Sequence, residues 1–378
     1  MRNGTVIICF ITVCFILLWT TIIQFSNQRD SLKLPAISKS LSAIVRYNEL
    51  NKNEETCVMF LKAHKCASTT VQNILMRFGY SRGLDFVLPL TGNYIGNPEL
   101  FDPSLIPAEL TSPSRRYDIF AHHTRYNYTA MKSVMKDNCK FVTILRDPAT
   151  LYESLFNFYH IENLVNLTLK DIMKSQKYWP KLNVRMLKRI GLNQMSWDLG
   201  YNNNENIDKF IAKIDKQFHL VMISEYMEAS LILLADLMNW PLEYVVSLKL
   251  NSRQMDKTKQ LTEDEHDKLI ELNLIDAELY DYFLEKFRQK LIKYGRKRLF
   301  KNVNKLLKLN KDLQSLCVDK LNNKGYAKTT SFDLRNSLNW TCIYSTKSEL
   351  PFTDEIRNDQ KERFKTMKKL EMLLIDIE

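Results

Sequence analysis

Short apolar runs and stretches with helical spacing alternate along the central part of the chain. Four runs are rich enough in apolar residues to form buried strands: Cys57–Ala63, Tyr117–Ala121, Lys140–Leu145 and Phe218–Ile223. Segments that place apolar residues on one helical face follow them, at 71–79, 130–136, 151–160 and 225–240. Because strands and helices alternate, the sequence predicts an α/β fold with a mostly parallel sheet flanked by helices.

The last third of the chain has a different pattern. From Leu261 onward the sequence is predominantly helical, and residues 351–378 predict a charged helical or loose tail. Ligands of open parallel sheets bind at the carboxyl ends of the strands. His64, His122 and Arg146 all fall at predicted strand ends, so we look for the chemistry there.

The N-terminus carries the longest apolar segment. Residues 6–25, VIICFITVCFILLWTTIIQF, contain no charge and are long enough to cross a bilayer as a helix. A cleaved signal peptide is the alternative, but no Ala-x-Ala cleavage pattern follows. We therefore expect a type II membrane protein with the following parts: cytosolic tail 1–5, signal anchor 6–25, polar stem 26–55, lumenal catalytic domain 56–350 and charged tail 351–378.

Sequons and cysteines fit a secretory protein. Three Asn-x-Thr sequons beyond the anchor are predicted glycosylation sites: Asn127, Asn166 and Asn339. Of the seven cysteines, Cys9 and Cys14 lie in the anchor segment, and we expect Cys66 to be the unpaired one. The other four allow three connectivities: Cys57, Cys139, Cys317 and Cys342. No Cys/His cluster has zinc spacing, so no metal is expected.

The first chemical motif is the segment KAHKCASTT at 62–70, between a predicted strand and a predicted helix. Such a loop presents backbone N–H groups, and the helix N-terminus adds partial positive charge, so together they suit an anion. Lys65 supplies a cation, and hydroxyls come from Ser68, Thr69 and Thr70. The glycines of a Walker A loop are absent. An ordinary helix cap by Ser68 or Thr69, with solvated lysines, is the competing interpretation.

The second motif begins at the end of another strand, in LRDPATLYESLFNF at 145–158. Arg146 leaves the strand, and Ser154 lies two helical turns later. A guanidinium and a hydroxyl suit a second phosphate group. A surface ion pair of Arg146 with Asp147 or Glu153 is the competing interpretation.

Together these segments resemble the sulfotransferases that use 3′-phosphoadenosine 5′-phosphosulfate. More narrowly, the chain resembles the galactose-3-O-sulfotransferase family, over roughly 57–344, in these segments: FLKAHKCASTTVQNILMRFG, FAHHTRYN, FVTILRDPATLYESLFNFY, NQMSWDLG and LVMISEYMEASLILLADLMNWPLEYVVSLKLNSR. The resemblance implies a P-loop-like sulfotransferase fold behind an N-terminal transmembrane helix, in a Golgi type II enzyme. It also implies sulfuryl transfer to a galactose hydroxyl of a glycolipid or glycan, without a metal.

The resemblance also implies residue roles. The 5′-phosphosulfate would be held by the loop, with the residues Lys65, Ala67, Ser68, Thr69 and Thr70. Arg146 and Ser154 would hold the 3′-phosphate, and Lys62 would add positive charge. A histidine is the expected general base. We favour His64 in this role, with His122 or His123 second or acting on the acceptor, and Asn251 and Arg253 are weaker candidates for nucleotide contact.

The net charge of the chain adds little to this interpretation. The chain has 54 Lys+Arg and 43 Asp+Glu in 378 residues, a net charge of +11, and a composition typical of a globular protein. Residues 286–311 contain eleven Lys or Arg and no acid, so this predicted amphipathic helix equals the whole excess. A solvated basic face is its plainest interpretation, and donor steering or contact with acidic lipids are alternatives. A nucleic-acid partner is not expected, because no recognition module is visible.

Three other functions compete with this interpretation. A nucleotide kinase predicts Walker A glycines, which are missing. An anchored lectin or scaffold that does no catalysis would be expected to lose the loop at 62–70 that contains Lys65 (hereafter the lysine loop), which is intact here. A sulfotransferase for heparan-type or other glycans shares the donor chemistry and differs only in its acceptor.

Overall fold

The computed structural model describes residues 54–202, 204–248, 261–322, 331–335 and 337–375. The expected tail and anchor at 1–25, most of the stem, and Asn251 and Arg253 lie outside these ranges. Within them, no helix is both long and apolar enough to span a membrane.

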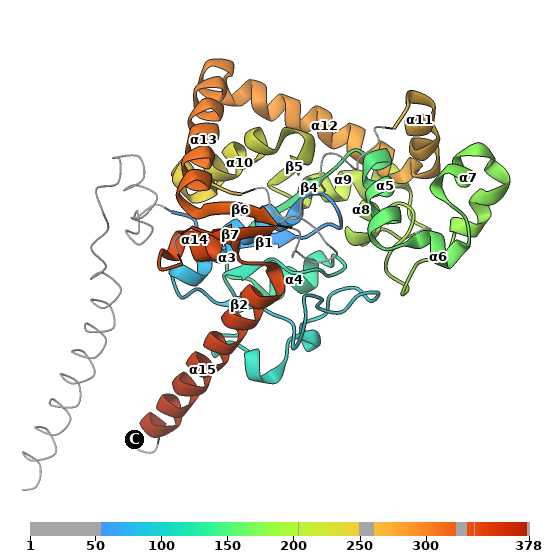
Figure 1. The fold of residues 1–378 in the computed structure, drawn as a ribbon. Coiled ribbons are helices and arrows are strands. Elements are labelled where there is room, and N and C mark those ends of the chain that lie inside the picture. The colour runs from blue at the N-terminus through green and yellow to red at the C-terminus, as the bar shows by residue number, and fades with distance from the viewer. Residues whose placement is uncertain (1–53, 203, 249–260, 323–330, 336, 376–378) are drawn as a thin grey trace, which may run out of the picture. The chain divides into compact units, whose positions relative to one another are not determined.

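A five-stranded parallel sheet lies at the centre of the folded unit (Figure 1). Its strands are β1 (Val58–Leu61), β2 (Phe86–Val87), β3 (Ile119–Phe120), β4 (Lys140–Leu145) and β5 (Leu220–Ile223), in the order β2-β3-β1-β4-β5. Every neighbouring pair runs parallel. The four predicted strands are therefore confirmed, although β3 is shorter than the predicted run. The two-residue β2 was not predicted, because it is too short to leave a pattern.

Helices flank the sheet, as predicted. The helices between and after the strands are α3 (Ser68–Ser81), α4 (Tyr128–Val134), α5 (Pro148–Phe158), α6 (Ile161–Val165), α7 (Leu169–Lys174), α8 (Gln194–Asp198), α9 (Ile207–Gln217) and α10 (Met227–Leu237). Parallel crossovers are right-handed, and the chain leaves β1 toward β2 but leaves β4 toward β5. The carboxyl ends of β1 and β4 therefore border the crevice where connections diverge, which is the usual ligand position in such sheets.

The C-terminal part is mainly helical, with one departure from the prediction. Its helices are α11 (Glu263–Leu272), α12 (Leu274–Tyr294), α13 (Arg296–Cys317), α14 (Trp340–Thr346) and α15 (Glu349–Ile375). An antiparallel hairpin of β6 (Val318–Asn322) and β7 (Ser331–Leu334) interrupts them. The prediction of a predominantly helical part from Leu261 onward is therefore confirmed, and this hairpin is the one described element there that was not predicted. Both strands are too short and polar for an alternating pattern to be recognised.

The basic segment 286–311 forms two helices and not the single amphipathic helix predicted. Gly295 separates α12 from α13 and has a φ of 96°, which L-residues rarely adopt. Its N–H donates to the carbonyls of Leu291 and Ile292, which ends α12.

Two disulfides join distant parts of the described chain. Cys57, before β1, is bonded to Cys139, before β4, and Cys317 at the end of α13 is bonded to Cys342 in α14. Cys66 is a buried free thiol, which confirms the prediction that it is unpaired. Burial raises the pKa of this thiol, so it stays protonated at neutral pH.

The tail predicted at 351–378 to be either helical or loose is helical as far as Ile375, because it forms most of α15. The part of α15 up to Phe364 packs against the rest of the folded unit, and Phe352, Ile356 and Phe364 are buried. Gln360 accepts a hydrogen bond from the backbone N–H of Phe86 at 2.7 Å and donates to its carbonyl at 2.8 Å. These bonds satisfy backbone groups on the edge strand β2.

Candidate active site

The loop between β1 and α3 is folded tightly beneath the first turn of the helix. Lys65 and Ala67 both have a φ of 56°, in the left-handed region, and the Ser68 hydroxyl donates to the Ala63 carbonyl at 2.7 Å. Ala67 is the N-cap residue of α3, and no side chain caps the helix. The competing prediction of a Ser68 or Thr69 cap is therefore wrong. N–H groups at an uncapped helix N-terminus suit an anion.

The loop after β4 adjoins the lysine loop. Arg146 donates from Nη1 to the Lys65 carbonyl at 3.0 Å and from Nε to the Thr150 hydroxyl at 3.2 Å. Asp147, considered above as a surface partner of Arg146, instead caps α5 and contacts His266 Nε2 at 3.0 Å. The two predicted phosphate motifs thus lie side by side. Two loops that each carry a cationic side chain, joined by this hydrogen bond to the Lys65 backbone, suit a ligand with two anionic groups.

Helix α5 supplies the far wall of this region. The Lys65 ammonium lies 3.5 Å from the centroid of the Phe158 ring, which is a close cation–π contact. Ser154, on the same helix, is buried. Arg146, which was predicted to act together with Ser154, contacts Thr150 on this same helix.

His64 is held by a buried carboxylate. Asp198, at the end of α8, accepts hydrogen bonds from the His64 backbone N–H and from its Nδ1, each at 2.8 Å. Gln194 donates to the other Asp198 oxygen at 2.9 Å. Nδ1 therefore carries the proton, and Nε2, which accepts from the Tyr94 hydroxyl at 2.8 Å, is the basic nitrogen.

His123 stacks on His64, whereas His122 points elsewhere. The His64 and His123 ring centroids are 4.1 Å apart, and His123 Nδ1 donates to the Lys62 carbonyl at 3.0 Å. Burial lowers the pKa of His123 well below its ordinary value, so its imidazole is neutral at pH 7. His122 Nε2 instead contacts the Thr353 hydroxyl of α15 at 3.0 Å, and burial lowers its pKa to about 4. This contact with α15 separates His122 from the other two histidines.

Lys62 also turns away from the loop. Its side chain is buried, and its ammonium forms an ion pair with Glu349 at 2.6 Å. The structure thus brings His64, Lys65, His123, Arg146 and the start of α3 together. Lys62 and His122 line the side of this region that faces α15.

With this geometry in place, comparison with known proteins identifies the family. The model of the family described as galactose-3-O-sulfotransferase matches residues 1–335. This chain belongs to the galactose-3-O-sulfotransferase family.

The relatives of this galactose-3-O-sulfotransferase family member include galactosylceramide sulfotransferases. Those of Bos taurus and Homo sapiens are each 32% identical over 278 residues, which cover 69% of this chain and 64% of the relative. Galactose-3-O-sulfotransferase 2 of Sus scrofa is 31% identical over 294 residues, 74% of this chain and 73% of the relative. The chain thus spans just under two thirds of the length of those galactosylceramide sulfotransferases.

Several residues of the site in this family member were not found from the sequence. Asp198 lies in the quoted segment NQMSWDLG, but nothing there indicates that its carboxylate reaches a loop 134 positions earlier. Asp276 anchors the same segment, since it accepts from the backbone N–H of Met195 at 2.9 Å and from the Ser196 hydroxyl at 2.6 Å. Burial raises the pKa of Asp276 to about 6. An acid among apolar residues was the only sequence signal.

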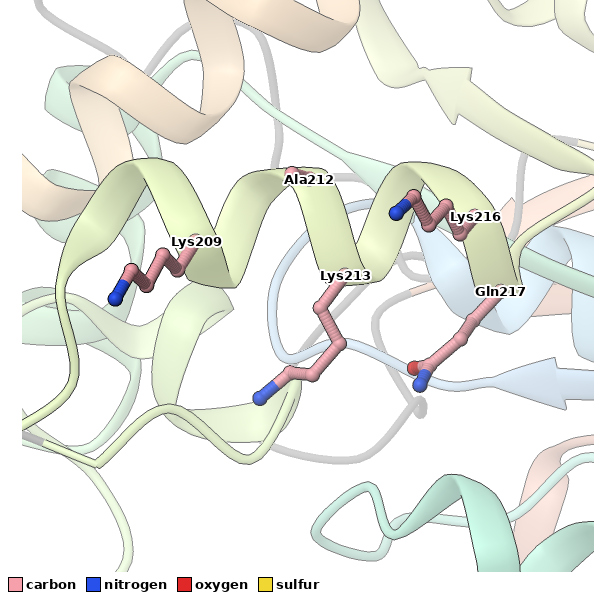
Figure 2. Close-up of a pocket in the computed structure, with 5 residues that line it drawn as sticks. All are labelled: Lys209, Ala212, Lys213, Lys216 and Gln217. Atoms are coloured by element: carbon pink, nitrogen blue, oxygen red, sulfur yellow. The ribbon is translucent and has the colours of Figure 1, made fainter.

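A pocket outside the site and the search for metal-binding groups bear on other ligands. A shallow pocket of about 400 Å³ lies on α9, lined by Lys209, Ala212, Lys213, Lys216 and Gln217 (Figure 2). Because α9 leads into the amino end of β5, this pocket belongs to a different edge of the sheet from the galactose-3-O-sulfotransferase motifs. In the described ranges, no group of three or more His, Cys, Asp or Glu side chains is placed to hold a metal.

Proposed function

We propose that the protein transfers a sulfuryl group from 3′-phosphoadenosine 5′-phosphosulfate to the 3-hydroxyl of a galactose residue on a glycolipid or glycoprotein glycan. The family membership and the names of the relatives support this proposal. The observation that carries it is the contact between the two anion-binding motifs, Arg146 Nη1 to the Lys65 carbonyl at 3.0 Å. A donor with a 5′-phosphosulfate and a 3′-phosphate needs two such sites within one nucleotide.

The residues present suit that donor. The uncapped start of α3, with Lys65, Ala67, Ser68, Thr69 and Thr70, would hold the 5′-phosphosulfate. Arg146 and Ser154 would hold the 3′-phosphate and so discriminate against ordinary adenine nucleotides. The strand order β2-β3-β1-β4-β5, with this loop after the central strand, supports a P-loop-like sulfotransferase fold.

The chemistry requires positioning and charge neutralisation more than covalent catalysis. When bound, the donor supplies the sulfuryl group and leaves as adenosine 3′,5′-bisphosphate. The galactose oxygen forms a bond to sulfur while the sulfur–oxygen bond to the 5′-phosphate breaks, and the leaving oxygen keeps the electron pair. Lys65 stabilises the charge that develops there, and a histidine accepts the hydroxyl proton.

We assign His64 as the base. Asp198 contacts Nδ1 at 2.8 Å and stabilises the imidazolium that forms when Nε2 takes the proton. His123 is the second candidate, because its Nδ1 donates to a neutral carbonyl and its Nε2 carries no proton. His122 fits this role least, since its Nε2 contacts the Thr353 hydroxyl of α15 and not the donor loop.

The proposal also includes the cellular setting. A Golgi type II topology, with residues 6–25 as the anchor and the folded unit in the lumen, agrees with two disulfides in that unit. Of the three sequons, Asn166 is exposed, Asn127 is half-buried and caps α4, and Asn339 is buried and caps α14. Asn166 is therefore the glycan site that the fold admits most readily.

The test uses the full-length chain in detergent, with donor labelled in the sulfuryl group and a panel of β-galactosides. We expect label on galactose O3, loss of transfer with Lys65→Ala, and a larger loss of kcat for His64→Ala than for His123→Ala. Near-normal turnover by His64→Ala with none by His123→Ala would reverse the assignment of the base. Transfer only to uronate-containing chains would favour the alternative acceptor, a heparan-type or other proteoglycan chain.

A further inference from the structure

The ammonium of Lys62 is buried, so it needs an oppositely charged partner. Lys62 follows the central strand β1, two residues before His64, and its side chain is 2% exposed. Withdrawing an ammonium from water costs several kcal/mol unless an opposite charge and hydrogen bonds compensate. Among the described residues, Glu349 supplies the one carboxylate in contact with this ammonium, at 2.6 Å. The Lys62 backbone is fixed as well, because its carbonyl accepts from His123 Nδ1.

Glu349 is the first residue of α15, and this helix binds to the loops at several strand ends. The Glu349 carboxylate also accepts from Asn93 Nδ2 at 3.1 Å, and Thr353 contacts His122. One turn later, Arg357 donates to the carbonyls of Pro89 and Gly92, in the segment after β2. α15 therefore connects segments that follow β1, β2 and β3. It lies beyond residue 335, where the family match ends.

We propose that Glu349 is a positioning residue for the donor site, and that through it α15 is a working part of the active site. Glu349 holds the Lys62 ammonium charged and fixed, and this ion pair fixes the end of β1, from which the donor loop begins two residues later. This inference rests on the proposed sulfuryl transfer, since the anionic donor of that reaction is the ligand of the loop next to Lys62.

Electrostatics around Lys62 predict a measurable consequence. The groups that face it are Glu349 from α15 and His122 and His123 from the end of β3, with Arg357 of α15 near His122 and His64 near His123. Burial lowers the pKa of Lys62, and the Glu349 charge and hydrogen bond oppose that lowering. Glu349→Gln removes the opposing effect, so the pKa of Lys62 falls further. Its charge, and any activity that needs it, is then lost as the pH rises through this lower pKa.

The experiment compares full-length wild type, Glu349→Gln and Glu349→Asp. Glu362→Gln, at an exposed carboxylate on the same helix with only a distant lysine at 3.8 Å, is the matched control. We measure kcat from pH 6 to 9.5 and, without catalysis, the affinity for adenosine 3′,5′-bisphosphate by calorimetry over the same range. Thermal unfolding at each pH identifies a variant that has lost its fold.

For Glu349→Gln we expect an alkaline limb that begins at lower pH than in wild type, with both kcat and affinity falling tenfold or more by pH 9. Glu349→Asp restores part of the range, and Glu362→Gln matches wild type. A merely structural role for Glu349 lowers the melting temperature and leaves the profiles of the folded fraction parallel, which overturns the inference. If wild type binds the nucleotide but transfers no sulfate, the proposed function fails, and the affinity profile still tests the role of Glu349.

Discussion

Replacing Asp198 by asparagine tests the site at a fully buried carboxylate. Asp198 is fully buried and accepts three hydrogen bonds, two from His64 and one from Gln194. An asparagine keeps one acceptor oxygen but presents an NH₂ group toward at least one of these donors. The His64 backbone N–H and Nδ1 both contact Oδ2 at 2.8 Å, whereas Oδ1 accepts from Gln194 and lies 3.0 Å from Nδ1. An asparagine that keeps its oxygen in the Oδ2 place puts its NH₂ in the Oδ1 place, where it faces the Gln194 amide and offers an N–H to Nδ1. The imidazole proton then moves to Nε2, and the ring can no longer accept a proton there.

The expected loss follows from the value of a general base. Proton transfer by a positioned side chain contributes about 10²–10⁴-fold in rate. A histidine locked in the wrong tautomer by an Asp-to-Asn change in a serine protease loses about 10⁴-fold. We therefore expect kcat of Asp198→Asn to fall by about 10²–10⁴-fold, or roughly 3–5 kcal/mol in the activation free energy. Affinity for adenosine 3′,5′-bisphosphate stays within about threefold, because the donor contacts come from other residues.

The assay is single-turnover transfer of labelled sulfate to a β-galactoside at pH 7.5, with nucleotide affinity measured alongside. Asp208→Asn, at an exposed position on α9, is the matched control. A buried donor left without an acceptor also costs about 1–3 kcal/mol of stability, so transfer is measured well below the melting temperature. Turnover within threefold of wild type in a folded Asp198→Asn would refute the assignment of His64 as an oriented base.

Three further predictions concern the donor, the fold and glycosylation. Arg146→Ala should weaken adenosine 3′,5′-bisphosphate by about 10–100-fold while adenosine 5′-phosphate changes little, since a charge-assisted hydrogen bond contributes about 1.5–3 kcal/mol; equal losses for both ligands would argue against a 3′-phosphate contact. Cys317→Ser/Cys342→Ser opens a bridge with a separation of 25 residues and should lower the unfolding free energy by about 3 kcal/mol in denaturant titrations, a result that an unchanged midpoint would contradict. Asn166→Gln should remove one glycan, seen as faster migration on a gel. Asn339→Gln should leave migration unchanged and lower the melting temperature, because α14 loses its cap. The reverse pattern would contradict the fold.

Patterns within one segment predicted most of the sheet. Buried strands such as Lys140–Leu145 can be recognised in the sequence as apolar runs, because a strand covered on both faces does not alternate apolar with polar residues. The loop beginning at Lys62 and the position of Arg146 could also be placed at strand ends by the same reasoning. The two-residue β2 and the β6–β7 hairpin could not be predicted, because their pairing depends on partners and not on local apolar periodicity.

Contacts between distant segments account for what the sequence could not predict in the site. Asp198 reaches His64 across 134 positions, and Glu349 reaches Lys62 across 287. Asp198 stands in the quoted segment NQMSWDLG, which does not show what its carboxylate contacts, and Glu349 stands in no quoted segment. Only the packing of α8 and α15 on the strand ends brings them there. The same packing separates His122 from His123, which are adjacent in sequence but contact different elements.

The most direct test of the account is the position of the label after incubation of the full-length chain with labelled sulfate donor and a terminal β-galactoside. The account predicts label on O3 of the galactose, dependent on Lys65 and independent of added metal. A chain that binds adenosine 3′,5′-bisphosphate but labels no galactoside, whether lipid-linked or glycan-linked, would contradict it.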